Sequence, residues 1–567
     1  MIKTVHSRNM LGRVLGIGLL SLAAVAAPAQ KQAQSPTKPR VVITADPELD
    51  DNNTLIRAVL YSSDIKIEGL VYASSEFHWK GDGKGTTQYL KTAQYNRFAL
   101  CPCKSWRFMD NERFIDHIID AYAEAYPNLK VHNPGYPTPA ELKSKIKWGN
   151  VAFEGDFSQD TEGSNLIKAL LLDKNTEPLY VTVQGGASTV ARALKSIYEQ
   201  YAKTPQWREI QEKVSRKLII VPSGDQDGTL VSYIRPNWPD IKVVQIFGGV
   251  NFGYGAQNMT ADEYKVYFSP TWTQENVLSR GPLGKLYRVW GDGRIMVPGD
   301  PTEYFQLSDY TKDQLTKMGY LVWVGPLEKG SFLGEGDTGT FINFVSNGLN
   351  AYEYPNWGGW GGTLRNGGIV FGFSRDNAPK LPPDASGVAE GLAPAGSNAN
   401  APSDEERKEI QQKLLDAFKA RSNRSGMFAG GTPPRAGLGS HFLSAAQNDF
   451  AARLKWAVTP RFKDANHAPV VEINGPLAIS ARPGSVVSLE GKVSDPDSNS
   501  VSVKWWQYDD AGTYPGDISF STTSELKSTF QVPDDAKPGQ TIHIVLEATD
   551  DGAPPLTRYQ RVVVTVR

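Results

Sequence analysis

The feature that most constrains this chain is an apolar run that ends in a cluster of carboxylates. Residues 41–45 read Val-Val-Ile-Thr-Ala, and Asp46, Glu48, Asp50 and Asp51 follow at once. An apolar run of this length is typical of a strand buried in a parallel sheet. Carboxylates this close together repel one another, so they are tolerated where water solvates them or where a divalent cation lies among them. The second case would place a metal-dependent site at the end of the strand.

The alternation of strand and helix patterns continues through the first two thirds of the chain. Strands are predicted at residues 41–45, 65–72, 179–183, 218–222, 243–247 and 320–324. Helices are predicted around residues 55–60 and at 164–172, 188–201 and 442–458. Short strands that alternate with helices predict an α/β fold, namely a mostly parallel sheet with helices on both faces.

A change to period-two hydrophobicity predicts a second, all-β domain over residues 468–567. Its short strands are separated by Pro-Gly, Asp-Pro-Asp and Asp-Gly turn signals, which is typical of an immunoglobulin-like sandwich. Four aspartates fall in the predicted loops: Asp495, Asp497, Asp550 and Asp551. Ordinary turn chemistry explains them, and a second calcium site would explain them as well.

The remaining segments predict export and flexible connections. Residues 1–29 have the basic start, short apolar stretch and small-residue cleavage pattern of a signal peptide, with a membrane anchor as the alternative. The other predicted parts are a tether (30–39), the α/β domain (40–375), a low-complexity insertion with a charged helix at 404–421 (376–441), and a packing helix with a linker (442–467). The mature protein is therefore expected to be periplasmic or secreted, with no membrane span.

Charge and cysteine content narrow the classes of partner and site. The 60 Lys and Arg residues nearly balance the 61 Asp and Glu residues, which gives no reason to expect a nucleic acid polymer or an anionic membrane as partner. These patterns leave the oligomeric state open. Cys101 and Cys103 flank a single proline, so a bridge between them would be strained. Structural or free thiols are predicted, with a labile disulfide as the alternative.

Helix capping accounts for part of the acidic cluster without a metal. Asp46 would be the N-cap residue, Pro47 suits the first helical position, and Glu48 is favourable in the first turn. Capping does not need Asp50 and Asp51 as well. The residues alone therefore leave capping and metal binding open.

Three segments resemble nucleoside hydrolases, the calcium-dependent N-ribohydrolases. Residues 44–51, Thr-Ala-Asp-Pro-Glu-Leu-Asp-Asp, resemble the family signature Asp-x-Asp-Pro-Gly-x-Asp-Asp, which also follows a first strand and opens a helix. Residues 181–189, Val-Thr-Val-Gln-Gly-Gly-Ala-Ser-Thr, resemble the segment whose strand ends in a calcium-binding main-chain carbonyl. Residues 335–338, Glu-Gly-Asp-Thr, resemble the late segment that brings a distal metal aspartate.

Nearly the whole mature chain resembles a narrower family. These are secreted cellulose-binding proteins with a nucleoside-hydrolase-like domain and a C-terminal β-sandwich. The resemblance is carried by residues 64–71 (Asp-Ile-Lys-Ile-Glu-Gly-Leu-Val), 223–227 (Ser-Gly-Asp-Gln-Asp), 355–362 (Pro-Asn-Trp-Gly-Gly-Trp-Gly-Gly) and 466–471 (Asn-His-Ala-Pro-Val-Val). It is specific as to family and uninformative as to substrate.

The resemblance implies a role for each matching residue. Asp46 and Asp51 would bind calcium through side-chain oxygens, Gln184 through its main-chain carbonyl, and Asp337 would complete the set. Asp50 would bind a sugar hydroxyl. Calcium would hold a water molecule, Asp46 would take its proton as the catalytic base, and the surrounding carboxylates would favour the positive charge that develops on the sugar.

The chain departs from the family signature at several positions. Thr44 replaces the first aspartate, and Glu48 replaces the glycine, so Glu48 is predicted to change the pocket or to bind substrate. The family's Gly-Asn after the second strand is also absent. Glu76, His78 and Trp79 stand there as candidates for the leaving-group side, with His78 as the acid and an exposed loop histidine as the alternative.

Two functional hypotheses from different classes follow. The first is an exported calcium-dependent hydrolase of glycosyl, N-glycosyl-like bonds in a sugar-containing substrate. The second is a non-catalytic protein that binds cellulose or plant cell wall carbohydrate. Trp357 and Trp360, which lie among glycines, are predicted to form a sugar-stacking platform, with a tight turn and buried rings as the alternative.

Overall fold

The structure is a computed structural model that describes residues 38–88, 101–297, 300, 302–366, 380–387 and 438–567, with a few positions between 403 and 413. The predicted signal peptide (1–29) and most of the predicted tether and insertion lie outside the described residues. Of the predicted charged helix (404–421), only a few positions between 405 and 413 are described, and these are helical. Within the described part, no helix is both long enough and apolar enough to cross a membrane.

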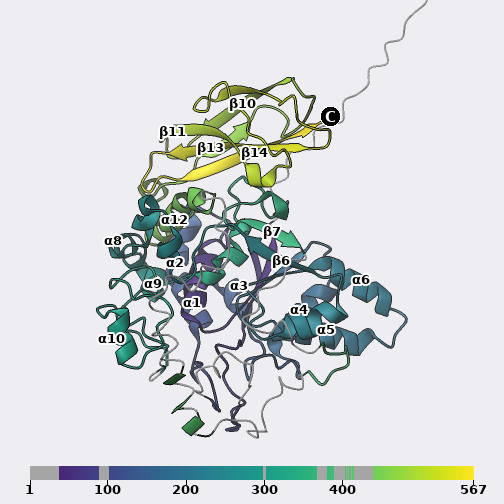
Figure 1. The fold of residues 1–567 in the computed structure, drawn as a ribbon, viewed down its shortest axis with the longest axis vertical. Coiled ribbons are helices and arrows are strands. Elements are labelled where there is room, and N and C mark those ends of the chain that lie inside the picture. Colours follow the sequence, from purple (N-terminus) through teal and green to yellow (C-terminus); the bar gives the residue numbers. More distant parts are fainter. Residues whose placement is uncertain are drawn as a thin grey trace, which may run out of the picture. The chain divides into compact units, whose positions relative to one another are not determined.

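A seven-stranded sheet forms the centre of the α/β region (Figure 1). Its spatial order is β3-β2-β1-β4-β5-β6-β7. The first six strands pair in parallel, and β7 pairs antiparallel with β6 at the edge. This confirms the predicted mostly parallel sheet. The strands are β1 (Arg40–Ala45), β2 (Lys66–Tyr72), β3 (Ile146–Trp148), β4 (Leu179–Val183), β5 (Leu218–Pro222), β6 (Lys242–Phe247) and β7 (Thr363–Asn366).

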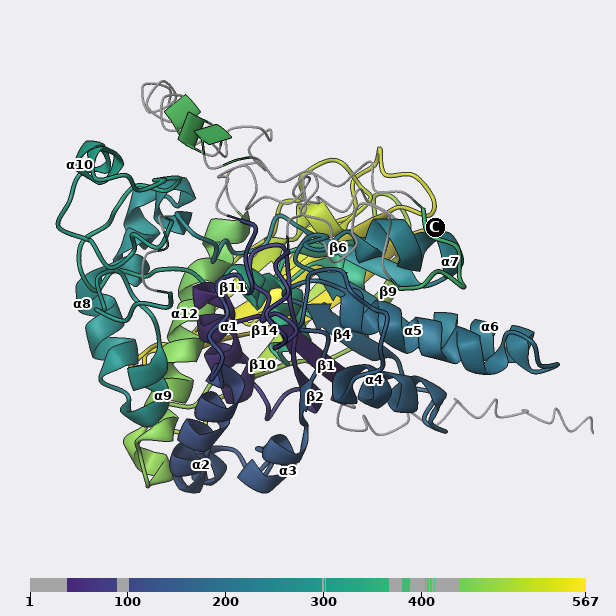
Figure 2. The same ribbon diagram turned by 90° about the horizontal axis from the view of Figure 1, so that it is seen from below.

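Helices cover both faces of this sheet (Figure 2). Strand β1 serves both layers, because Val41 and Ile43 belong to one apolar core and Val42 belongs to the other. On the first face lie α1 (Leu49–Leu60), α2 (Phe114–His132), α9 (Gly281–Leu286) and α12 (Leu438–Ala457). On the second lie α4 (Glu162–Leu172), α5 (Ser188–Tyr201) and α6 (Trp207–Lys217). Short helices are α3 (Pro139–Ser144), α7 (Arg235–Asn237), α8 (Pro270–Thr273) and α10 (Lys312–Lys317).

The strand order reverses between β1 and β4. Strands β2 and β3 lie on one side of β1, whereas β4, β5 and β6 lie on the other. The connections therefore leave the carboxyl ends of β1 and β4 in opposite directions, and ligands of such sheets bind in the crevice between them. Asp46 follows β1, and Gln184 follows β4 with its amide donating to the Thr44 carbonyl oxygen at 2.9 Å.

Two local predictions were wrong. Residues 320–324 are not a strand, because the amides of Trp323 and Val324 donate to the hydroxyl of Tyr304 at 3.1 and 2.8 Å instead of to a neighbouring strand. Cys101 and Cys103 form a disulfide, so they are not free thiols. Their Cα atoms lie 4.6 Å apart, within the range that a disulfide spans. Strands β3 and β7 and helix α2 were not predicted.

The C-terminal region packs two sheets face to face, which confirms the predicted β-sandwich. Leu489 of one sheet and Leu546 of the other lie in the core that the sheets share. One sheet has the order β12-β10-β8, and the other β11-β13-β14-β9. The strands are β8 (Val470–Ile473), β9 (Ala478–Ala481), β10 (Val486–Ser494), β11 (Val501–Gln507), β12 (Lys527–Gln531), β13 (Thr541–Asp550) and β14 (Thr557–Val566).

Candidate functional site

The carboxylates that follow β1 are buried together. Asp46, Asp50 and Asp51 have exposed fractions of 0%, 6% and 1%. Glu48, not Asp46, is the N-cap residue of α1, and its side chain forms no capping hydrogen bond. The turn instead folds on itself, since the Asp46 amide donates to Asp51 at 3.2 Å and the Glu48 amide donates to Asp46 at 3.3 Å. Helix capping by Asp46 is therefore not the explanation of this cluster.

Two distant segments meet this acidic turn. Asp337 lies in a 3-10 turn, Gly336–Thr340, whose first amide donates to the Asp50 carboxylate at 3.0 Å. The Asp337 carboxyl lies within hydrogen-bonding reach of Asp51. On the other side, Gly185 lies so close that a Cβ there would stand 2.9 Å from Asp46 Oδ2. The structure thus brings together Asp46, Glu48, Asp50, Asp51, Gln184 and Asp337.

Burial and mutual repulsion raise the pKa values of these carboxyl groups. Burial raises the pKa of Asp46 to about 6 and that of Asp337 to about 7. Burial, with the neighbouring negative charges, holds the pKa values of Asp50 and Asp51 well above their usual range. In the described part of the chain, no lysine or arginine forms an ion pair with any of these four aspartates. These four aspartates therefore repel one another without a lysine or arginine to balance them.

The residues present fit a divalent cation. The oxygen atoms Asp46 Oδ2 and Gln184 Oε1 are buried without a hydrogen-bonding partner. Carboxylate oxygens of Glu48, Asp50 and Asp51 lie within 4.8 Å of one another. Dense, hard oxygen donors of this kind suit calcium. The main-chain carbonyl of Gln184 already accepts from Gln226 at 2.9 Å, which leaves its second lone pair available.

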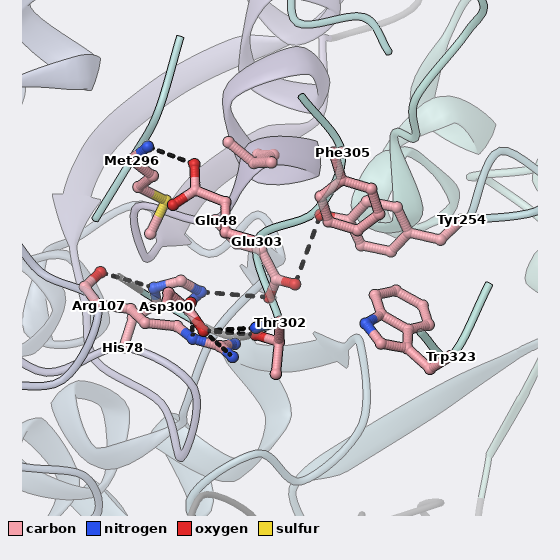
Figure 3. A pocket seen from close by; sticks show the side chains of 11 residues that line it. Glu48, His78, Arg107, Tyr254, Met296, Asp300, Thr302, Glu303, Phe305 and Trp323 are labelled. Carbon is pink, nitrogen blue, oxygen red and sulfur yellow. Dashed lines mark hydrogen bonds and ion pairs between the residues drawn. The ribbon is translucent and has the colours of Figure 1, made fainter. Parts of the chain in front are cut away.

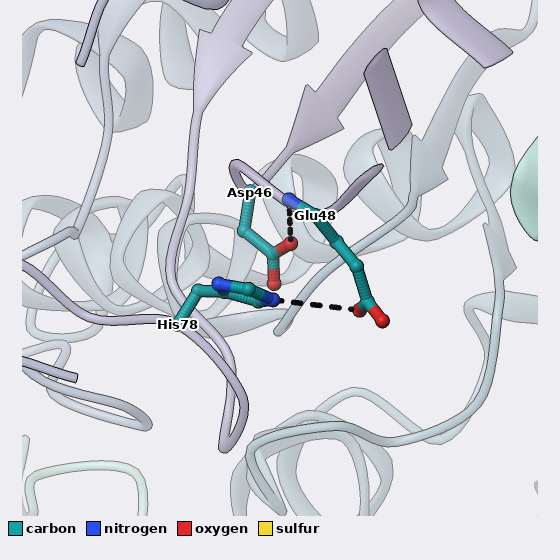
Figure 4. A group of neighbouring side chains, drawn as sticks. All are labelled: Asp46, Glu48 and His78. Atoms are coloured by element: carbon teal, nitrogen blue, oxygen red, sulfur yellow. Dashed lines mark hydrogen bonds and ion pairs between the residues drawn. The ribbon is translucent and has the colours of Figure 1, made fainter. Parts of the chain in front are cut away.

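His78 faces the acidic turn (Figure 4). Its Nδ1 lies 2.8 Å from the Arg107 carbonyl oxygen, which only accepts, so Nδ1 carries a hydrogen. Its Nε2 lies 3.7 Å from Glu48 Oε2. Burial lowers the pKa of His78, but Asp46 and Glu48 outweigh burial, so the pKa is raised. The ring is 2% exposed, which excludes the alternative of an exposed loop histidine.

A pocket with about 370 Å³ of empty space, part of it open to solvent, lies beside Glu48 and His78 (Figure 3). One wall is aromatic. Tyr254 and Phe305 stack with centroids 5.3 Å apart, and Trp323 stands edge-on to both rings.

The opposite wall is charged, and the aromatic wall contacts the acidic turn. Arg107 pairs with Asp300 at 2.5 Å across from the aromatic rings. The Tyr254 hydroxyl donates to Asp50 at 3.0 Å and lies 3.5 Å from Glu48. None of these wall residues was predicted. They come from loops without a local motif, so no signal in the sequence marks them.

Several predicted substrate contacts are misplaced. Trp79, predicted on the leaving-group side, and Trp360, predicted to stack on a sugar, both have exposed fractions of 0%, and neither lines the pocket. Trp360 therefore offers no ring face for stacking. Trp357 is partly exposed, stacks on Tyr354 beside the sandwich and does not line the pocket, so its stacking on a sugar stays a prediction. Glu76 is buried after β2 with its amide donating to the Gln226 carbonyl oxygen, and its substrate role stays a prediction.

Two family models match the chain. Residues 40–364 match the model described as cellulose-binding Sde182, nucleoside hydrolase-like domain. The chain belongs to this family. Residues 486–566 match the model described as cellulose-binding protein Sde0182, C-terminal domain.

A solved structure supports the same fold. It is a nucleoside hydrolase-related hypothetical protein from Saccharophagus degradans, described as associated with carbohydrate metabolism. The likeness covers 94% of this chain and 100% of that one, with 24% identity and a TM-score of 0.58. At that identity it is evidence for the fold alone. Comparison with curated proteins gives no match.

In this family member, the two departures from the nucleoside hydrolase signature have opposite effects on the charge of the acidic turn. Thr44 is buried, and its hydroxyl donates to the Thr182 carbonyl oxygen on β4 at 3.4 Å, so it adds no charge. Glu48 reaches back among the aspartates, with a carboxylate oxygen in both groups of clustered donors. One carboxylate is lost at residue 44, and another is gained four residues later.

Proposed function

We propose that this protein hydrolyses glycosyl bonds, of the N-glycosyl type or similar, in a sugar-containing substrate, and that it depends on calcium. One observation carries the proposal. Asp46 holds a buried carboxylate oxygen without a partner, at the point where the acidic turn meets the distant segment that carries Asp337 and the segment that carries Gln184. Proteins rarely leave such an oxygen bare, so its position supports a bound cation and a reacting water molecule beside it.

The donor set of the cation follows from this geometry. Asp46, Asp51, Asp337 and the Gln184 carbonyl oxygen would hold the cation, and Glu48 would supply the carboxylate that Thr44 lacks. Bound there, a divalent cation supplies Lewis-acid polarisation of water.

The chain's own residues would perform the remaining steps. Asp46 Oδ2 would accept the proton of the attacking water molecule. Asp50, held by the Gly336 amide and the Tyr254 hydroxyl, would accept a hydrogen bond from a sugar hydroxyl. The negative potential of the cluster favours the positive charge that builds on the sugar in an oxocarbenium-like transition state.

The leaving group would receive its proton from His78. Nδ1 is anchored on the Arg107 carbonyl oxygen, so Nε2 is the nitrogen that faces the pocket. The aromatic wall of Tyr254, Phe305 and Trp323 would pack against the apolar face of the ligand and keep water out. The protein would act in the periplasm or outside the cell.

A second candidate is carbohydrate binding without turnover. The replacement of the family's first aspartate by a buried, uncharged Thr44 favours it, because a weakened cation site would bind sugar and fail to cleave it. The descriptions of both matching families name cellulose binding, which suggests cellulose or plant cell wall carbohydrate as the ligand.

Turnover on defined substrates separates the two candidates. Full-length protein is incubated with nucleosides, cello-oligosaccharides and plant cell wall oligosaccharides, with calcium and with EGTA. We expect calcium-dependent product release that Asp46→Asn lowers by about 10²–10⁴-fold. Asp120→Asn, the same change at an exposed ion pair with Lys143, serves as the matched control. Cellulose binding that EGTA leaves intact, with no product from any substrate, would establish the binding protein instead.

A further inference from the structure

A second group of acidic side chains lies where the linker between α12 and β8 meets the sandwich. Asp495 follows β10, and Asp550 ends β13 with an exposed fraction of 3%. Each carboxylate has one oxygen fully used by its own loop. Asp495 Oδ1 accepts from two backbone amides at 2.8 and 2.9 Å, and Asp550 Oδ1 accepts from two at 2.9 and 3.0 Å. Turn chemistry accounts for these Oδ1 atoms.

Turn chemistry does not account for the other two oxygens. The Oδ2 atoms of Asp495 and Asp550 are both buried, and neither has a hydrogen-bonding partner. A chain of hydrogen bonds joins the two carboxylates: Asn499 donates its backbone amide to Asp495 and its side chain to Asn466, which donates to Asp550. Burial and, to a smaller extent, the charge of Asp495 raise the pKa of Asp550. In the described part of the chain, no lysine or arginine forms an ion pair with either one. His467 is committed to Asp497 at 3.1 Å, and burial lowers its pKa.

Asn466 of the linker holds the two loops together. Its Nδ2 donates to Asp550 Oδ1 and to the Pro554 carbonyl oxygen, both at 2.8 Å, and its Oδ1 accepts from Asn499 at 2.7 Å. The fit is close, since a Cβ at Gly552 would come within 2.2 Å of the Asn466 amide group. These contacts position both carboxylates and leave their Oδ2 atoms bare.

We propose that Asp495 Oδ2 and Asp550 Oδ2 bind a divalent cation, calcium by the hardness of the donors, at the junction of the linker and the sandwich. A single cation would satisfy both buried oxygens and cancel the repulsion between them. Water molecules would complete its coordination. In the alternative, Asp495 and Asp550 share a proton. One carboxylate then gains a hydrogen-bonding partner, and the site binds no metal.

The proposed cation site lies beside a linker that also contacts the α/β region. His467, next to Asn466, stacks on Phe462 at 3.6 Å and lies 3.0 Å from His132 of α2. Trp456 of α12 donates to the Asn466 carbonyl oxygen at 2.8 Å. The linker is therefore held by the α/β region on one side and by the proposed calcium loops on the other. Calcium at this point would stiffen the connection between the two regions.

Counting bound calcium tests the proposal. Full-length protein is treated with EGTA, desalted and titrated with calcium chloride in a calorimeter, and its melting temperature is measured with and without calcium. We expect Asp495→Asn and Asp550→Asn each to bind one calcium fewer per chain than the wild type. Asp551→Asn is the matched control, because Asp551 is exposed and its Oδ1 already accepts from the Ser500 amide. It should bind as many calcium ions as the wild type.

Asp51→Asn separates this site from the one at β1. Loss of calcium in Asp51→Asn alone, with wild-type stoichiometry in both sandwich variants, would overturn the second site and leave the proposed hydrolase intact. Loss in the sandwich variants alone would support the second site and count against calcium at β1. Should Asp550→Asn fail to fold, Asp495→Asn decides, because Asp495 lies in a partly exposed loop. In that variant we expect calcium to raise the melting temperature less than in the wild type.

Discussion

Helix α1 carries two buried charge clusters that are built in opposite ways. At its first turn, Asp50 and Asp51 crowd together without a side-chain cation. Near its last turn, Arg57 is equally buried but fully paired, with Glu335 at 2.5 and 3.0 Å and Gln447 at 2.6 Å. The residues that meet these two clusters are almost adjacent in the chain. Glu335 pairs with Arg57, and Asp337, two residues later, joins the acidic turn.

The difference separates charges that the fold itself compensates from charges that it leaves uncompensated. Burying an ion costs several kcal/mol, which Glu335 and Gln447 offset for Arg57 within the protein. Nothing in the described residues does the same for Asp51. A charge that the fold leaves uncompensated marks a functional site more reliably than a buried charge as such.

The largest expected effect is at the paired end. Arg57→Met leaves Glu335 buried without its partner and should lower the free energy of unfolding by about 3–5 kcal/mol, measured by urea denaturation. Adding Glu335→Gln should restore part of that loss, since the stranded charge is removed. A single variant that loses less than about 1 kcal/mol would show that the paired cluster contributes little, and the comparison would fail.

The pH dependence of stability tests a second buried carboxylate that is paired with arginines. Asp449 of α12 pairs with Arg453 and Arg558, both at 2.8 Å, and despite its burial these arginines hold its pKa well below the usual range. A pKa that is lower in the folded state stabilises the protein above the unfolded value of about 3.9 and ceases to do so as the pH falls. We expect Asp449→Asn to cost about 2 kcal/mol at pH 7.

That difference between the wild type and Asp449→Asn should stay constant from about pH 7 to 5 and shrink below about pH 4, in urea denaturation series at each pH. Glu141→Gln, at an exposed capping carboxylate on α3, is the control and should show a far smaller change. A difference that grows as the pH falls would contradict the assignment.

The smallest effect, and one of opposite sign, belongs to the unpaired side. Asp51→Asn removes repulsion from neighbouring carboxylates, so it should raise the stability of the EGTA-treated protein by about 1 kcal/mol. The same variant should lose calcium binding at this site. In the contrary outcome, Asp51→Asn destabilises the calcium-free protein as much as Arg57→Met does. The charges of the acidic turn would then stabilise the fold, as those of the paired cluster do, and the comparison would fail.

The parts of the site that could be predicted lie where strands end. Asp46 and Asp51 follow a strand in a short segment with four carboxylates, and Gln184 and Asp337 were found by resemblance to a known family. The pocket wall could not be predicted. Trp323 was assigned to a strand. Its amide instead donates to the hydroxyl of Tyr304 in another loop, and the Trp323 ring lies at the pocket. Such a contact depends on a side chain far away in the chain and leaves no local pattern.

The periodicity of apolar residues by itself determined that a parallel α/β sheet precedes a β-sandwich, because each strand or helix must turn its apolar side toward a core. Only the tertiary structure decided which charges are compensated. Glu335 and Asp337 stand two residues apart in similar surroundings of sequence, yet one meets an arginine and the other meets more acid. Electrostatic energy depends on distances in space, which a local pattern does not contain.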